Sequence, residues 1–92
     1  MKVVFLPGAV RDLCWFRRYY EEIFRDGARR AGDHYRKALQ ALETMPHIGH
    51  PTPFGDVREF SIPRTPFAIL CRLREDRIEI MRVIDERALR ED

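Results

Sequence analysis

The sequence has few of the residues from which common catalytic sites are built. Ser61 is its only serine, and it lies in a strand-like run without flanking glycines, which argues against a serine nucleophile on a sharp turn. The five glycines never cluster, so the chain has no glycine-rich loop to hold phosphate groups. These absences exclude the best-known hydrolase and nucleotide-binding motifs.

Cysteine and histidine are also scarce. Cys14 and Cys71 are the only cysteines, lack a CxxC spacing and stand among apolar residues. We interpret both as small buried hydrophobic residues without a redox or metal role. His47 and His50 stand three residues apart in a segment rich in proline and glycine. Two imidazoles at this spacing can share a metal, but a site needs a third ligand, and we expect neither a metal nor a cofactor.

Long apolar runs are missing as well. The longest, residues 67–71, is far shorter than the roughly 20 residues that cross a membrane. The amino terminus has a short apolar core of four residues, whereas a secretory signal needs about 7–15. Hydrophobic residues nevertheless make up 45% of the 92 residues, enough for one small core. We therefore expect a single domain over residues 1–92, in the cytoplasm and without membrane contact.

Lysine is the scarcest charged residue, since only Lys2 and Lys37 occur among 17 basic residues. Fifteen acidic residues reduce the net charge to +2, too little for a general nucleic-acid binder. The dominance of arginine favours carboxylates, phosphates and aromatic faces as partners, because a guanidinium group binds them in bidentate or stacked geometry. A preference for arginine codons in a GC-rich genome would explain the same composition.

Hydrophobic periodicity along the chain predicts an α+β domain. The predicted elements are a strand at 3–6, helices at 9–26 and 28–45, a Pro- and Gly-rich loop at 46–56, and strands at 57–62, 67–73 and 77–84. The last two strands are joined by a short polar connection and form a hairpin. The nearly continuous apolar character of residues 67–71 indicates a central strand. The order β-α-α-β-β-β corresponds to a helical hairpin packed on one face of a twisted antiparallel sheet.

Two aromatic residues are candidates for a binding surface. Trp15 and Tyr19 stand one helical turn apart, beside the apolar stripe of the first predicted helix. They either widen the core stripe of a thin domain or form an exposed aromatic patch for a protein partner. Periodicity leaves both interpretations open.

Arginines in the predicted strands are the second candidate surface. Arg58, Arg72 and Arg82 each interrupt a strand that is otherwise largely apolar. They are either ordinary residues of an exposed face or a shared cationic surface for a phosphate backbone or an acidic helix. Asp85 and Arg87 follow the last predicted strand, where a bidentate pair between Asp85 and an arginine would fix the tail against the sheet.

Four strings in fixed order span most of the chain: Pro7-x-Ala9-x-x-Asp12-Leu13, Pro46-x-x-Gly49-x-Pro51, residues 57–73 and residues 76–83. Together they resemble the RelE/ParE superfamily of toxins from type II toxin–antitoxin (plasmid stabilisation) modules, most closely the ParE side. The resemblance implies a RelE-like fold and a toxin neutralised by a cognate antitoxin, in a heteromeric complex. The implied antitoxin is of the ribbon-helix-helix type, lies along the toxin's groove and sheet face, and alone contacts DNA.

The resemblance leaves the cellular target open. RelE-type toxins cut mRNA on the ribosome with basic residues and an aromatic or histidine group near the carboxyl terminus. Residues 85–92 contain no Tyr, His or Lys, which argues against that chemistry. ParE-type toxins are linked to poisoning DNA gyrase without catalysis, and we expect this activity, by protein contact. A ribosome-dependent endoribonuclease using Arg58, Arg72 and Arg82 and a non-toxic α+β interaction domain are the alternatives. The expected partner-binding residues are Trp15, Tyr19, Arg58, Arg72, Arg82, Asp85 and Arg87.

Overall fold

The computed structural model describes residues 2–23 and 28–86. Its elements are β1 (Lys2–Phe5), α1 (Pro7–Arg18), the π-helical turn η1 (Tyr19–Ile23), α2 (Ala28–Thr44), β2 (His50–Pro51), β3 (Val57–Ser61), β4 (Phe67–Leu73) and β5 (Arg77–Asp85). The predicted order is confirmed, with η1 and the short β2 as additions. The predicted end of the first helix, at residue 26, lies outside the described residues. Within these residues, the helices are too short or too polar to cross a membrane.

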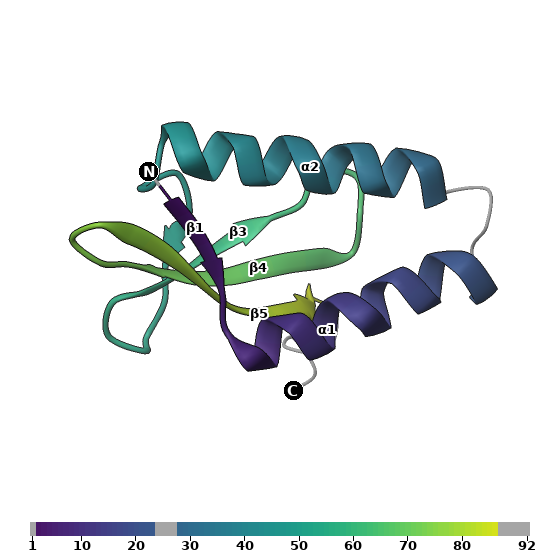
Figure 1. The fold of residues 1–92 in the computed structure, drawn as a ribbon, viewed down its shortest axis with the longest axis horizontal. Helices are drawn as coiled ribbons and strands as arrows, with labels where there is room; N and C mark the ends of the chain where they lie inside the picture. Colours follow the sequence, from purple (N-terminus) through teal and green to yellow (C-terminus); the bar gives the residue numbers. More distant parts are fainter. Residues whose placement is uncertain (1, 24–27, 87–92) are drawn as a thin grey trace.

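The five strands form one mixed sheet in the order β1-β5-β4-β3-β2 (Figure 1). The neighbours from β2 to β5 pair antiparallel, and β4 lies at the centre as predicted. β1 runs parallel to β5, so the prediction of a wholly antiparallel sheet is wrong for this strand. The long connection through both helices explains the difference, because only a tight hairpin obliges two paired strands to run in opposite directions.

β1 pairs only with the first half of β5, and α1 lies beside the second half. The Leu6 N–H donates to the Ile80 carbonyl at 2.9 Å, after which Pro7 begins the helix at a position that needs no N–H. The Asp12 carboxylate then accepts the Val83 N–H at 2.9 Å, a hydrogen bond that a neighbouring strand would otherwise supply. α1 therefore closes the edge of β5 that β1 leaves open.

Side chains from both helices and from one face of the sheet form the core. Ala38 and Leu42 of α2 are buried together with Ile69 of β4 and Ile80 of β5. On α1 the buried residues are Ala9 and Phe16. The core thus lies between a helical layer and the sheet, as the α+β order predicts.

The two cysteines lie in different environments. Cys71 is buried in β4, as predicted, and burial raises the pKa of its thiol. Cys14 is exposed, so the prediction that it is buried is wrong. Its helical position explains the difference, because Ala9 and Phe16 face the core from the opposite side of α1.

Gly49 lies where the chain enters β2 and is buried against β3. A Cβ atom at this position would lie 2.9 Å from the backbone oxygen of Glu59. We expect Gly49→Ala to lower the free energy of unfolding by about 1–3 kcal/mol, because the pairing of β2 with β3 must shift. Gly32→Ala in α2 is the matched control, since its Cβ would meet nothing nearer than 3.9 Å. Urea titration of both variants measures the effect, and an equal loss in the two would contradict this account.

Candidate functional site

Phe67 lies at the centre of an aromatic cluster at the end of α1. Its ring centroid is 4.9 Å from that of Phe16, 5.7 Å from that of Trp15 and 5.5 Å from that of Tyr19, all in edge-to-face geometry. Tyr20 completes the cluster at 6.1 Å. Tyr19 and Tyr20 are adjacent in sequence, and the wider turn of η1 lets both rings reach Phe67.

Trp15 and Tyr19 form the rim of this cluster. Their rings stack with centroids 5.9 Å apart, and 52% of Trp15 is exposed, whereas Tyr19 is partly buried. Trp15 therefore packs on the core through Phe67 while about half of it faces solvent. Its role in binding a protein partner stays a prediction. A pocket of about 210 Å³ lies beside the pair, bordered also by Arg18 and Glu22.

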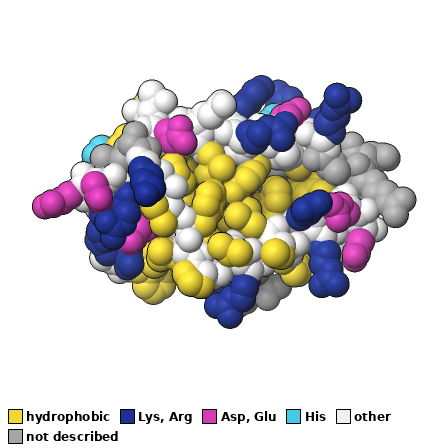
Figure 2. Space-filling view, in the orientation of Figure 1, with side chains coloured by type: hydrophobic (Ala, Val, Ile, Leu, Met, Phe, Trp, Pro, Cys, Tyr) yellow, Lys and Arg dark blue, Asp and Glu magenta, His cyan; other side chains and the backbone are white. Residues whose placement is uncertain are grey.

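An apolar groove separates α1 from α2. Figure 2 shows hydrophobic side chains gathered between the two helices, with charged side chains around them. Near η1 the groove deepens into a pocket of about 360 Å³ that is lined by Leu13, Phe16, Arg17, Tyr20, Glu21, Gly32 and Tyr35. Arg17 and Glu21 form an ion pair of 2.8 Å at its border. An apolar hollow with a charged rim is typical of a protein-binding surface.

Tyr35 supplies a phenol to this pocket, and burial raises its pKa to about 12. The folded chain therefore holds this proton more tightly than the unfolded chain, whose tyrosines titrate near pH 10. The contribution of the neutral Tyr35 phenol to the free energy of unfolding is therefore fully present below about pH 10 and is lost as the pH rises towards 12. In an ultraviolet titration of the folded protein we expect a late tyrosinate step that Tyr35→Phe removes. Completion of all tyrosine ionisation near pH 10 would contradict this expectation.

Arg58 lies on the helix-covered face of the sheet, opposite Cys71 in register. Its guanidinium donates hydrogen bonds to the carbonyls of His47 at 3.1 Å and Gly49 at 2.5 Å. Its buried Nε has no hydrogen-bond partner among the described residues. Arg58 therefore holds the loop before β2 against β3.

Arg82 is bound to the helix α1 through Asp12. The Arg82 Nε and Nη2 atoms donate to the two Asp12 oxygens at 2.6 Å and 3.1 Å. Hydrogen bonding to this carboxylate raises the pKa of the guanidinium. Arg82 thus connects β5 to α1.

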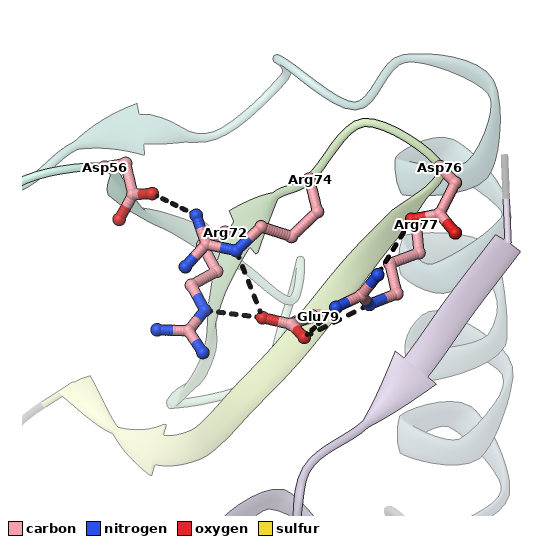
Figure 3. A network of polar contacts seen from close by, with 6 residues as sticks. All are labelled: Asp56, Arg72, Arg74, Asp76, Arg77 and Glu79. Carbon is pink, nitrogen blue, oxygen red and sulfur yellow. Dashed lines mark hydrogen bonds and ion pairs between the residues drawn. The ribbon is translucent and has the colours of Figure 1, made fainter.

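Arg72 belongs to a charged cluster that was not predicted from the sequence, at the turn end of the β4–β5 hairpin (Figure 3). We call it the hairpin cluster; its members are Asp56, Arg72, Arg74, Asp76, Arg77 and Glu79. Glu79 lies at its centre and is only 6% exposed. It accepts hydrogen bonds from Arg72 Nε at 2.6 Å and Arg77 Nε at 3.2 Å, and Arg74 Nε is 3.5 Å away. The hydrogen bond from Arg72 is the largest influence that lowers the pKa of the Glu79 carboxyl.

Two ion pairs extend the hairpin cluster outward. Arg74 Nη1 donates to Asp56 at 2.5 Å, and Arg77 Nη1 donates to Asp76 at 2.8 Å. Asp56 precedes β3, so its pair with Arg74 connects the β2–β3 loop to the hairpin. Alternation along β5 puts Arg77 and Glu79 on one face. The contact of Glu79 with Arg72 could not be predicted in this way, because it depends on the register that places the two residues opposite each other.

The remaining candidates lie elsewhere. Asp85 ends β5 opposite Phe67, and Arg87 lies outside the described residues. His50 pairs with Glu59 in the sheet, and His47 contributes its carbonyl to Arg58. Over residues 2–23 and 28–86, no three His, Cys, Asp or Glu side chains are grouped so as to hold a metal ion.

Solved structures share this architecture over nearly the whole chain. A chain of the chromosomal ParDE TA system from P. aeruginosa has 23% identity and a TM-score of 0.76, covering 92% of this chain and 95% of that one. A chain of the E. coli DinJ-YafQ complex has 11% identity and a TM-score of 0.67, and YafQ from E. coli strain BL21(DE3) has 8% and 0.66, each covering 98% of both chains. These likenesses confirm the RelE/ParE-like fold.

The sequence itself assigns the family. No curated protein matches the chain significantly. A family model described as "ParE toxin of type II toxin-antitoxin system, parDE" matches residues 3–89, nearly the full length. The chain therefore belongs to the ParE toxin family of type II toxin–antitoxin systems.

Proposed function

We propose that this chain arrests growth by inhibiting DNA gyrase through protein contact, and that a cognate antitoxin neutralises it. Its membership of the ParE family supports the toxin role. The similar ParDE and DinJ-YafQ structures come from toxin–antitoxin systems, which supports an antitoxin as partner. The expected antitoxin is a small ribbon-helix-helix protein, and DNA is then contacted only through it.

The apolar groove between α1 and α2 is the observation that carries the proposal (Figure 2). An exposed apolar surface of this kind is unfavourable in a monomer unless a partner covers it. A pocket of about 360 Å³ accepts one or two large apolar side chains, and the Arg17–Glu21 pair at its border suits the charged face of an amphipathic segment. The groove is therefore the proposed site of the antitoxin.

The placement of the strand arginines favours protein contact over RNA cleavage. Cleavage through a 2′-hydroxyl needs a proton acceptor and a proton donor beside the scissile phosphate. Arginine stays protonated and serves as neither at neutral pH. Arg58, Arg72 and Arg82 are also bound to three different partners: Arg58 to the loop before β2, Arg82 to Asp12 of α1 and Arg72 to Glu79. They do not converge on one phosphate.

Controlled expression of the full chain in E. coli tests the proposed activity, with plasmid supercoiling and mRNA integrity as readouts. Growth arrest with impaired supercoiling and intact mRNA is the expected result. Cleavage of mRNA at ribosome-bound codons would replace the proposal with a RelE-type ribonuclease. Normal growth at full expression would leave the non-toxic interaction domain as the remaining function.

A pocket-filling variant tests the groove. Gly32 lines the pocket and has open space around it, so Gly32→Leu should occupy the pocket without disturbing the core. We expect it to weaken binding of the antitoxin encoded beside the toxin gene by about 10-fold or more, while toxicity persists. Gly32→Ala is the matched control and should bind normally. Unchanged binding by Gly32→Leu in a calorimetric titration would place the antitoxin elsewhere.

A further inference from the structure

Phe54 is the most exposed large hydrophobic residue of the described chain, at 75%. It lies in the loop between β2 and β3, at the end of the molecule away from η1 and the groove pocket (Figure 1). A phenyl ring exposed to this extent contributes little to the free energy of folding, because most of its surface stays in water. Its burial in a partner protein would contribute much more free energy, and aromatic residues frequently supply most of the binding energy of an interface.

Hydrogen bonds hold the loop around Phe54 in one conformation. The Thr52 hydroxyl donates to the Val57 carbonyl at 2.8 Å and accepts the Phe54 N–H at 3.2 Å. The Val57 N–H in turn donates to the Phe54 carbonyl at 3.2 Å. Gly55 takes the left-handed φ of 62° that the tight turn requires. The ring is thus presented by an ordered backbone, so little conformational entropy is lost when it binds.

Unused guanidinium donors lie next to this loop. Asp56 connects the loop to Arg74 by the 2.5 Å ion pair, and Arg72 lies opposite Val57 in register. Arg72 donates a hydrogen bond only from its Nε, to Glu79, and its two terminal nitrogens have no hydrogen-bond partner within the described residues. Figure 3 shows the Nε contact. Its anchored Nε fixes the orientation of the planar group. The free edge therefore offers a fork of donors that fits one carboxylate.

The charge balance of the hairpin cluster selects the class of partner. Three arginines are matched there by Asp56, Asp76 and Glu79, so the cluster has no net charge to attract a polyanion from a distance. Nucleic-acid backbones are bound through an excess of positive charge. A single carboxylate that reaches the Arg72 fork at close range still gains its hydrogen bonds. This favours a folded protein surface.

We propose that Phe54, Arg72 and Arg74 form a second protein-binding surface, for a partner that offers an apolar pocket beside an Asp or Glu side chain. The surface lies at the other end of the molecule from the groove pocket. Its assignment to the cellular target of the toxin rests on the proposed function.

Site-specific photocrosslinking in E. coli cells, soon after expression is induced, tests this surface. The full chain carries p-benzoylphenylalanine in place of Phe54, and a matched control carries it in place of Lys37, which is exposed on α2. We expect one dominant protein adduct at position 54, with an Asp or Glu beside the crosslinked residue in its sequenced peptide. The combined substitution Arg72→Gln and Arg74→Gln should reduce the yield about 10-fold or more.

Three results of the crosslinking experiment would contradict the proposed surface. The proposal is overturned if the crosslinking yield at position 54 is no higher than at position 37. It is also overturned if the yield does not fall when Arg72 and Arg74 are replaced, or if the adduct is with nucleic acid. If the double variant fails to fold, Arg72→Lys replaces it, because lysine keeps a charge near Glu79 and loses the planar fork. Growth arrest by the unmodified chain is scored separately, so its absence refutes the proposed function without affecting the crosslinking result.

Discussion

Replacing Phe67 with alanine should lower the free energy of unfolding by about 3–5 kcal/mol. Phe67 is only 1% exposed, and four aromatic rings from α1 and η1 contact it. Truncation removes the ring around which these side chains pack and leaves a cavity beneath them. The total free energy of unfolding of a domain of this size is roughly 5–14 kcal/mol, so the substitution removes a large share of it. Urea titration followed through Trp15, the only tryptophan, measures the change directly.

Phe54→Ala is the matched control, because it removes the same ring from a site that is 75% exposed. Its stability should change by less than about 0.5 kcal/mol. Phe67→Leu, which fills part of the cavity, keeps the measurement possible if the alanine variant does not fold. Similar losses for Phe67→Ala and Phe54→Ala would mean that the aromatic cluster does not organise the core.

Most of the fold could be predicted from the sequence because it follows from local periodicity. The α2 helix, the central β4 and the β4–β5 hairpin each have a strong pattern and a clear turn or proline boundary. The direction of β1 could not be predicted, because four residues of a short apolar strand contain no information about which partner they pair with or in which orientation. β2 is too short, at two residues, to have a pattern at all.

The candidate site was harder to predict because it depends on register between strands. Arg58 and Arg72 look equivalent in sequence, but Arg58 pairs with Cys71 and therefore lies on the opposite face from Arg72. A register shift at Leu70 and Cys71 then sets where Arg82 lies relative to Glu79. Trp15 and Tyr19 were identified correctly as neighbours, since helical spacing alone brings them together.

Asp12→Ala should lower the free energy of unfolding by about 2 kcal/mol. The Asp12 carboxylate accepts two hydrogen bonds from Arg82 and one from the Val83 N–H, and these three bonds hold α1 against the free edge of β5. Alanine leaves the backbone N–H of Val83 without its acceptor. Arg82→Ala should cost less, about 1 kcal/mol, because that side chain is 55% exposed and its ion pair is screened by solvent. Urea titrations of the two single variants and of the double variant measure both losses and their coupling.

The coupling decides whether Arg82 is a binding residue or a structural one. If Arg82 acts through Asp12, the double variant should be more stable than the sum of the single losses predicts, by about 0.5–1 kcal/mol. Arg17→Ala is a control for an exposed ion pair, that with Glu21, and should change stability by less than about 0.5 kcal/mol. If toxicity falls in proportion to stability in both single variants, the role of Arg82 is to attach α1 to β5. Loss of toxicity in Arg82→Ala alone, with an unchanged unfolding midpoint, would instead assign its guanidinium to the target.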